Sequence, residues 1–106
     1  MSQHKIVIYV PFSHADQVRA AIGEVGGGKI GNYSFCSFST KGIGRFKPEA
    51  GASPTIGAVG KLEEVEEEKI EVTCDSEKVK EIVVAIKQVH PYEEVVMDVW
   101  QLVDLG

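Results

Sequence analysis

The sequence predicts one α+β domain in which four strands form a single antiparallel sheet and two helices cover one of its faces, in the order βαββαβ. Three observations predict it: two segments carry apolar residues at helical spacing, four segments are β-branched or alternating, and no linker divides the chain. With 106 residues, the chain is long enough for one core and too short for two. Its 43% hydrophobic and 25% charged residues exclude a disordered tail and a disulfide-stapled miniprotein.

The first strand and the first helix are expected at the N-terminal end. Residues 5–10 (KIVIYV) are β-branched and apolar on both sides, which is typical of a central strand, and Pro11 ends it. Ser13 is expected to cap the following helix, with Asp16 as its capping-box partner. The three glycines at 26–28 are expected to end this helix. Its apolar face is formed by Ala15, Val18, Ile22 and Val25.

A second strand, a long loop and a third strand are expected in the middle of the chain. Residues 33–40 (YSFCSFST) combine aromatic and hydroxyl side chains, which favours an edge strand. The glycine-rich segment at about 41–61 is interpreted as a loop, and long loops in compact domains are usually functional or mobile. Residues 62–74 alternate between apolar and polar side chains near their end, which predicts a half-buried strand.

The second helix and the fourth strand complete the predicted domain. Apolar residues at helical spacing predict a helix over 79–89, and His90 with Pro91 ends it. The fourth strand is expected over 95–102. Two right-handed crossovers then place the first and third strands at the centre of a ferredoxin-like split βαβ sandwich, with the second and third strands as a hairpin.

The two cysteines are expected to be free thiols in a reducing compartment. If the hairpin register is symmetric about Pro54 and Thr55, Cys36 lies near Cys74, although this proximity is not evidence of a bond. Zinc modules need paired cysteines or histidines at short spacing, and the sequence has none.

The net charge of −5 comes from one short segment. Five glutamates within 63–68 account for all of it, and the rest of the chain has equal numbers of acids and bases. A neutral body without a basic face excludes nucleic-acid wrapping. The acidic segment is interpreted as a solvated stretch that also protects a strand edge. No apolar run approaches the roughly 20 residues of a membrane span, and no signal-peptide pattern is present, so we expect a cytoplasmic protein.

The basic and glycine residues of the loop suggest a small anionic ligand. Glycines let backbone N–H groups approach a ligand closely, and basic side chains favour an anion. The dinucleotide and P-loop fingerprints are both incomplete here. The alternative is a turn-rich connector that packs on a neighbouring subunit. The candidate ligand-binding residues are Lys41, Gly42, Gly44, Arg45, Lys47, Asn32 and Tyr33.

The segment after the second helix suggests a divalent cation. His90, Glu93 and Glu94 could hold a metal ion, with His14 or Cys36 adding a ligand from elsewhere. A Cys/His pair would favour copper or zinc, whereas carboxylates alone would favour harder ions. The alternative is structural: histidine closes a helix, proline stops it, and a tyrosine buries its ring. A divalent metal is therefore the one cofactor considered, and no catalytic residue is assigned.

Several motifs occur together in a characteristic order, and together they cover about residues 5–103. They are VPFSHA (10–15), GNY (31–33) with Cys36, GIGRFKP (42–48), GASPTIG (51–57), VEE (65–67) and HPYEE (90–94). In this order they resemble the PII/CutA-like domain inserted in YqfO-type members of the NIF-three-like family, here as a stand-alone chain. One departure is Val95, where relatives often carry proline after the double glutamate.

The resemblance implies a ferredoxin-like fold and assembly through the sheet, commonly as trimers. It does not imply hydrolase chemistry, because the dinuclear metal site of that family sits in flanking halves that this chain lacks. A physical argument points the same way: one face of the sheet is uncovered, and Phe35 or Phe38 with Val99 or Trp100 is expected to make it too apolar for a monomer.

We therefore expect a homo-oligomer, with a trimer favoured, that acts as a non-enzymatic binding or regulatory module for a small anionic ligand or metal ion. Two alternatives are a structural module that docks on another protein and a metal-dependent enzyme with a site shared between subunits.

Overall fold

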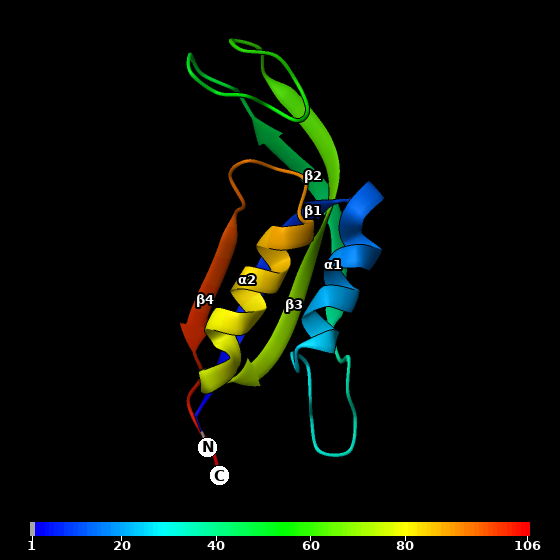
Figure 1. The fold of residues 1–106 in the computed structure, drawn as a ribbon, viewed down its shortest axis with the longest axis vertical. Helices are drawn as coiled ribbons and strands as arrows, with labels where there is room; N and C mark the ends of the chain where they lie inside the picture. The colour runs from blue at the N-terminus through cyan, green and yellow to red at the C-terminus, as the bar shows by residue number, and fades with distance from the viewer. Residues whose placement is uncertain (1) are drawn as a thin grey trace.

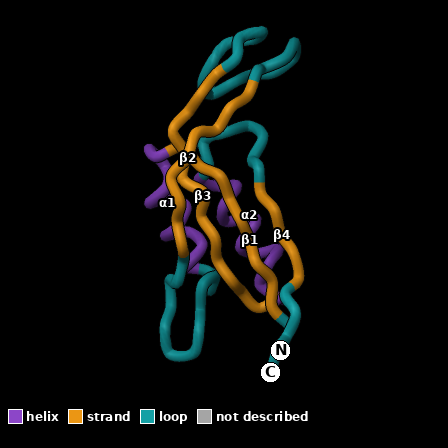
Figure 2. The backbone as a smooth tube through the Cα atoms, turned by 180° about the vertical axis from the view of Figure 1, so that it is seen from behind, coloured by secondary structure: helices purple, strands orange, loops and turns teal. Residues whose placement is uncertain are grey.

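The computed structural model describes residues 2–106 and confirms the predicted fold. The elements are β1 (Gln3–Pro11), α1 (Phe12–Glu24), β2 (Phe38–Phe46), β3 (Glu63–Asp75), the 3₁₀ turn η1 (Ser76–Lys78), α2 (Val79–Val89) and β4 (Met97–Gln101). The strands form one sheet in the order β2-β3-β1-β4, and every neighbouring pair is antiparallel. Both helices lie on one face of this sheet, and the other face is uncovered (Figures 1 and 2).

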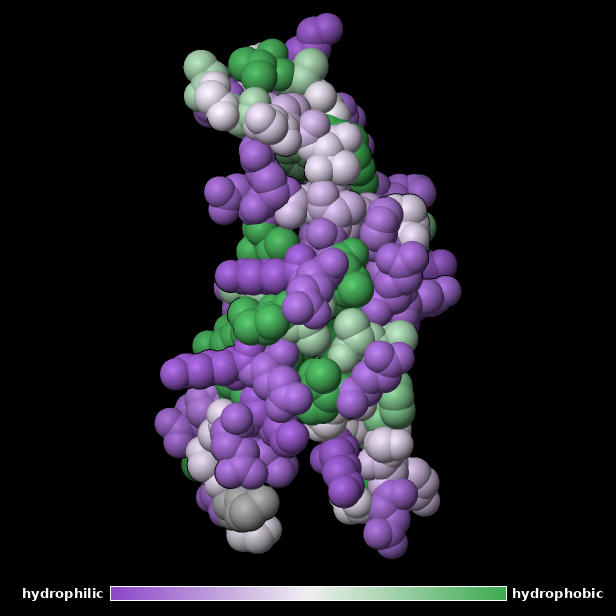
Figure 3. Space-filling view, viewed as in Figure 1, coloured by the Kyte–Doolittle hydropathy of each residue, from purple (hydrophilic) through white to green (hydrophobic). Residues whose placement is uncertain are grey.

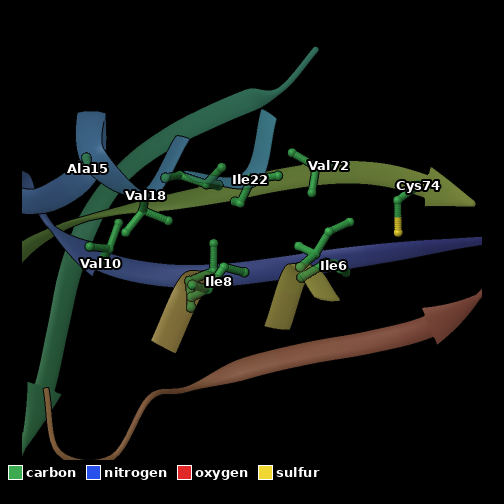
Figure 4. Close-up of a cluster of buried hydrophobic side chains, with 11 residues drawn as sticks. Ile6, Ile8, Val10, Ala15, Val18, Ile22, Val72 and Cys74 are labelled. Carbon is green, nitrogen blue, oxygen red and sulfur yellow. The ribbon is translucent and has the colours of Figure 1, made fainter. Parts of the chain in front are cut away.

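The core lies between the helices and the two central strands. Along β1, Ile6, Ile8 and Val10 point toward the helices and are fully buried, and β3 contributes Ile70 and Val72 opposite them (Figure 4). The helices contribute their apolar faces to the same cluster. Burial of each large aliphatic side chain stabilises the fold by about 1.5–3 kcal/mol, so this layer contributes most of the stabilisation. The outer surface on the helix side carries many hydrophilic side chains, with hydrophobic ones between them (Figure 3).

The second strand begins five residues later than the sequence predicts and ends six residues later. Residues 33–37 form part of a loop in which Ile30 and Tyr33 make an isolated bridge and Phe35 has a positive φ of 59°. The Phe35 ring packs where a side chain on Gly23 of α1 would lie, so this loop folds back on α1 instead of joining the sheet. β2 then continues through Phe46, because its residues pair with the acidic segment of β3. The true loop is therefore 47–62.

The hairpin register agrees with the prediction, but the cysteines do not meet. Gly42 pairs with Glu67, which makes the β2–β3 ladder symmetric about Pro54 and Thr55. Gly28 lies between Cys36 and β3: its N–H donates to the Thr73 carbonyl and its carbonyl accepts from the Cys36 N–H. Both cysteines are free.

The predicted caps and edges need two corrections. α1 begins at Phe12 after Pro11, and Ser13 Oγ lies 2.8 Å from His14 Nδ1 instead of capping the helix. The acidic segment does not protect an edge, because it belongs to β3 and is paired with β2. Glu68, for example, forms an ion pair with Arg19 of α1.

The molecule is elongated, with extents of 49 × 22 × 21 Å. The β2–β3 hairpin projects from one end, and the α1–β2 loop and both chain ends lie at the other (Figure 1). Within residues 2–106, each helix falls short of the length and apolar character that crossing a bilayer requires.

Gly28, whose backbone bonds to both Thr73 and Cys36 and so forms a bridge between them, makes a testable contribution to stability. Gly28 and Gly31 both have positive φ, at 76° and 56°, but a Cβ on Gly28 would overlap the backbone of Cys36, whereas a Cβ on Gly31 meets nothing within 4 Å. Both alanine variants should lose about 1 kcal/mol to the left-handed conformation. Gly28→Ala should lose a further 1–3 kcal/mol or so by overlap, as measured by urea unfolding. Equal losses would contradict this role of the bridge.

Candidate functional site

A groove of about 610 Å³ lies on the uncovered face of the sheet, where the hairpin leaves the body of the domain. β2 forms one wall and the segment after α2 forms the other. Its lining residues are Tyr9, Thr40, Lys41, Gly42, Ile43, Gly44, Arg45, Phe46, Glu67, Lys69, Tyr92, Val96 and Asp98. Concave sites of this size with aromatic walls and a few polar groups are typical of small-molecule binding.

The basic side chains of β2 are held away from the groove floor. Lys41 Nζ lies 5.2 Å from the centroid of the Phe12 ring, on the helix side of the sheet. Arg45 Nε lies 3.2 Å from Glu64 Oε1. Because side chains alternate along a strand, Gly42 and Gly44 are the β2 residues between them that face the groove. The wall at this point is therefore bare backbone.

A carboxylate occupies the space beside one of these glycines, Gly44. Glu67 Oε2 accepts a hydrogen bond of 3.0 Å from the Tyr92 hydroxyl. A Cβ on Gly44 would overlap the Glu67 carboxylate, whereas a Cβ on Gly42 would meet nothing within 4 Å. Burial, together with the bond to Glu67, raises the pKa of Tyr92 far above its ordinary value, so the phenol stays protonated and keeps donating.

His90 anchors the turn from which Tyr92 projects. Its side chain is buried, with 8% exposure, and its Nε2 lies 2.8 Å from the Tyr9 carbonyl. Its Nδ1 lies 3.2 Å from the Tyr92 backbone nitrogen. The carbonyl can only accept and the N–H can only donate, so the ring is neutral with its proton on Nε2. Burial lowers the pKa of His90, which favours the same neutral form.

The same turn holds the hairpin loop. The Thr55 hydroxyl donates a hydrogen bond of 2.7 Å to the Pro91 carbonyl. The Ser53 backbone N–H donates to Glu93 Oε1 at 2.9 Å. Residues 90–94, which we call the 90–94 turn, therefore contact β1, β3 and the hairpin loop at once.

The structure does not assemble the predicted metal ligands. Within residues 2–106, no three histidine, cysteine or acidic side chains are grouped so that they could hold a metal ion. Both ring nitrogens of His90 are engaged, and Glu93 is bonded to the loop. Cys36 lies in the α1–β2 loop at the far end of the molecule, and His14 contacts Ser13. Glu94 lines a small cavity beside the hairpin loop.

The predicted ligand-binding set is brought together only in part. Lys41, Gly42, Gly44 and Arg45 line the groove. Lys47 lies outside it and pairs with Glu49. Asn32 and Tyr33 belong to the α1–β2 loop, at the opposite end of the molecule from the hairpin (Figure 1).

Sequence reasoning missed the other wall and the floor of the groove, formed by Tyr9, Glu67, Lys69, Tyr92 and Asp98. The predicted hairpin register already placed Glu67 opposite Gly42, which was a usable signal for that residue. Nothing in the spacing of Tyr9 or Asp98 indicates a groove, because the two residues meet only through the pairing of β1 with β4, in which Asp98 lies opposite Val7.

Comparison with known proteins confirms the resemblance. No protein-family model matches the chain. It is 49% identical over 105 residues to a GTP cyclohydrolase 1 type 2 homolog of Halalkalibacterium halodurans, covering 99% of this chain and 28% of the relative. The crystal structure of a Bacillus cereus protein related to NIF3 matches with a TM-score of 0.85 and 42% identity, over 97% of this chain and 26% of that protein. The chain thus spans about a quarter of the length of these relatives.

Two smaller proteins have the same fold throughout. The periplasmic divalent cation tolerance protein CutA of Archaeoglobus fulgidus superposes with a TM-score of 0.69 at 20% identity, over 98% of this chain and 86% of CutA. A Bacillus subtilis GlnK–ATP complex superposes with a TM-score of 0.65 at 13% identity, over 95% and 82% of the two chains. The chain therefore has a ferredoxin-like fold of the PII/CutA type and matches the corresponding quarter of NIF3-related proteins.

The buried neutral His90 predicts a pH dependence of stability. Because its pKa is lower in the folded state than its ordinary value of about 6.5, the unfolded chain binds more protons between the two values. The stabilisation is complete above about pH 6.5 and is lost as the pH falls toward the folded pKa. His90→Gln keeps a donor for the Tyr9 carbonyl and removes the titration, so its melting temperature should fall less between pH 7.5 and 5 than that of the wild type. Parallel curves would contradict the assignment.

Proposed function

We propose that this domain is a non-enzymatic binding or regulatory module whose groove takes a small molecule with a flat ring and an anionic group. The observation that carries the proposal is the composition of the groove: aromatic side chains, bare glycine backbone and an uncommitted lysine meet on the one face that the domain does not cover.

The aromatic side chains and the glycines favour a flat ring. Tyr9, Phe46 and Tyr92 line the groove, and the Phe46 and Tyr92 rings have centroids 6.1 Å apart. The backbone at Gly42 carries no side chain to keep a ring away, and nothing lies within 4 Å of the place that its Cβ would take. Stacking on aromatic rings is favourable for any planar group and requires little sequence specificity.

The charged groups favour a ligand that carries an anion and also hydrogen-bond donors. Lys69 lines the groove, and among residues 2–106 it has no carboxylate within ion-pair distance. It can therefore pair with an anionic group. Glu67 and Asp98 line the same groove and can accept hydrogen bonds from amino or hydroxyl groups. Nucleotides combine all these features, and the GlnK structure of the same fold is a complex with ATP.

We also propose that the chain self-associates through the uncovered face, with a trimer favoured. Phe38 and Trp100 lie on this face, one on each edge strand, and are 67% and 44% exposed, so two large apolar side chains are without cover. The face is more polar than the sequence suggests, because Lys5 and Glu71 form an ion pair of 2.8 Å beside them. Phe35 lies in the α1–β2 loop, and Val99 lies on the opposite side of β4 from Trp100, pairing with Ile6.

Ligand binding can be tested by thermal shift with ATP, GTP, AMP and inorganic phosphate. A ligand at 100 times its Kd stabilises the folded state by about 2.7 kcal/mol, which raises the melting temperature by several degrees. Lys69→Gln should abolish the shift, whereas Lys80→Gln, on the exposed surface of α2, should not. The absence of a shift with every probe, or equal shifts in both variants, would reject the anion-binding groove.

Self-association can be tested by sedimentation velocity over a range of concentrations. The wild type should sediment as an oligomer, and Trp100→Lys should reduce its mass. Val84→Lys is a matched control, because Val84 is 55% exposed on the helix layer and should leave the mass unchanged. A wild type that remains a single 11.5 kDa species at high concentration would contradict this proposal.

A further inference from the structure

The hairpin loop, residues 47–62, is fastened to the domain through the 90–94 turn. Two hydrogen bonds join it to the turn. The Thr55 hydroxyl donates to the backbone carbonyl of Pro91, and the Ser53 N–H donates to the side-chain carboxylate of Glu93. Other backbone bonds lie within the loop, such as Gly60 N–H to the Pro48 carbonyl at 2.7 Å. Such internal bonds let the loop keep its shape when its contacts with the turn are broken.

The turn is in direct contact with the groove. Tyr92, two residues after His90, lines the groove and donates its hydroxyl to Glu67 on the groove floor. The next residue, Glu93, holds the loop. One short segment is thus bonded on one side to a groove residue and on the other to the projecting hairpin.

A small pocket also separates part of the turn from the loop. A cavity of about 120 Å³ lies between them, lined by Pro54, Ile56 and Glu94 among others, together with Tyr92 itself. A displaced Tyr92 ring would therefore change the surface on which the loop rests, without any change in the core.

We propose that the 90–94 turn couples the groove to the hairpin loop, so that a molecule which takes Glu67 from Tyr92 releases the loop from the domain. A ligand with a hydrogen-bond donor competes with the Tyr92 hydroxyl for the Glu67 carboxylate. Such a ligand binds more tightly when Tyr92 is displaced than when Tyr92 is bonded to Glu67, and this difference in affinity shifts the equilibrium toward the displaced state. That a ligand releases the loop rests on the proposed function. The bonded connection from Glu67 through the 90–94 turn to the loop does not depend on any ligand.

The link can therefore be tested without a ligand, by amide hydrogen exchange on the full chain. Tyr92→Phe removes the hydroxyl that bonds Glu67, and Gly44→Ala displaces the carboxylate with a new Cβ. In both variants the Ser53 amide, which Glu93 protects, should exchange roughly 10-fold faster than in the wild type.

Gly42→Ala is the matched control, because it makes the same chemical change on the same strand where a Cβ meets nothing within 4 Å. It should leave Ser53 exchange unchanged, and the core amides of Ile6 and Ile70 should keep their protection in all three variants. Unchanged Ser53 exchange in Tyr92→Phe with an intact core would overturn the coupling. Equal acceleration in both glycine variants would also overturn it. Neither result depends on whether ATP or phosphate binds, so failure of the ligand panel is a separate outcome.

Discussion

The geometry of the site follows from the unequal lengths of two neighbouring strands. β1 ends at Pro11, which pairs with Glu67, whereas β3 begins four residues earlier at Glu63. Beyond this step β3 has β2 as its only partner, so the pair leaves the sheet as a projecting hairpin (Figure 1). The groove lies at the step, and the 90–94 turn covers the end of β1, because His90 Nε2 donates a hydrogen bond to the Tyr9 carbonyl.

The glutamates of residues 63–68 have different contacts at this step. Glu68 pairs with Arg19 on the helix side, and Glu67, on the opposite side of the strand, bonds Tyr92 at the groove. Glu64 holds Arg45 away from the groove floor. A segment that reads as a uniformly solvated stretch thus contributes one residue to tertiary packing and another to the candidate site, because alternation along β3 sends neighbouring side chains to opposite faces.

The fold could be predicted from the sequence because each element has a local pattern of its own. The continuous β-branched apolar run of residues 5–10 and the helical spacing of Ile82 and Ile86 are local patterns, independent of the rest of the chain. Ile6, Ile8, Ile82 and Ile86 are all buried as expected. The position of β2 could not be predicted, because glycine and lysine in residues 41–46 have weak strand propensity and become a strand only by pairing with β3. The sequence pointed to this strand and to the 90–94 turn as places of binding, but it did not identify Tyr9, Lys69 or Asp98, which reach the groove from distant parts of the sequence.

The sequence left two interpretations of the His-Pro-Tyr-Glu-Glu motif open, a metal site and a structural turn. In the structure its polar groups bond to the protein itself, and residues 2–106 bring no metal-binding group of three side chains together. These bonds support the structural interpretation, in which the turn holds the groove and the loop in register. The most direct test is the tautomer and metal response of His90, measured by long-range ¹H–¹⁵N NMR with and without one equivalent of Zn²⁺. The account predicts a neutral ring protonated at Nε2 that is unchanged by zinc; a ring protonated at Nδ1, or one whose nitrogen shifts move with zinc, would contradict it.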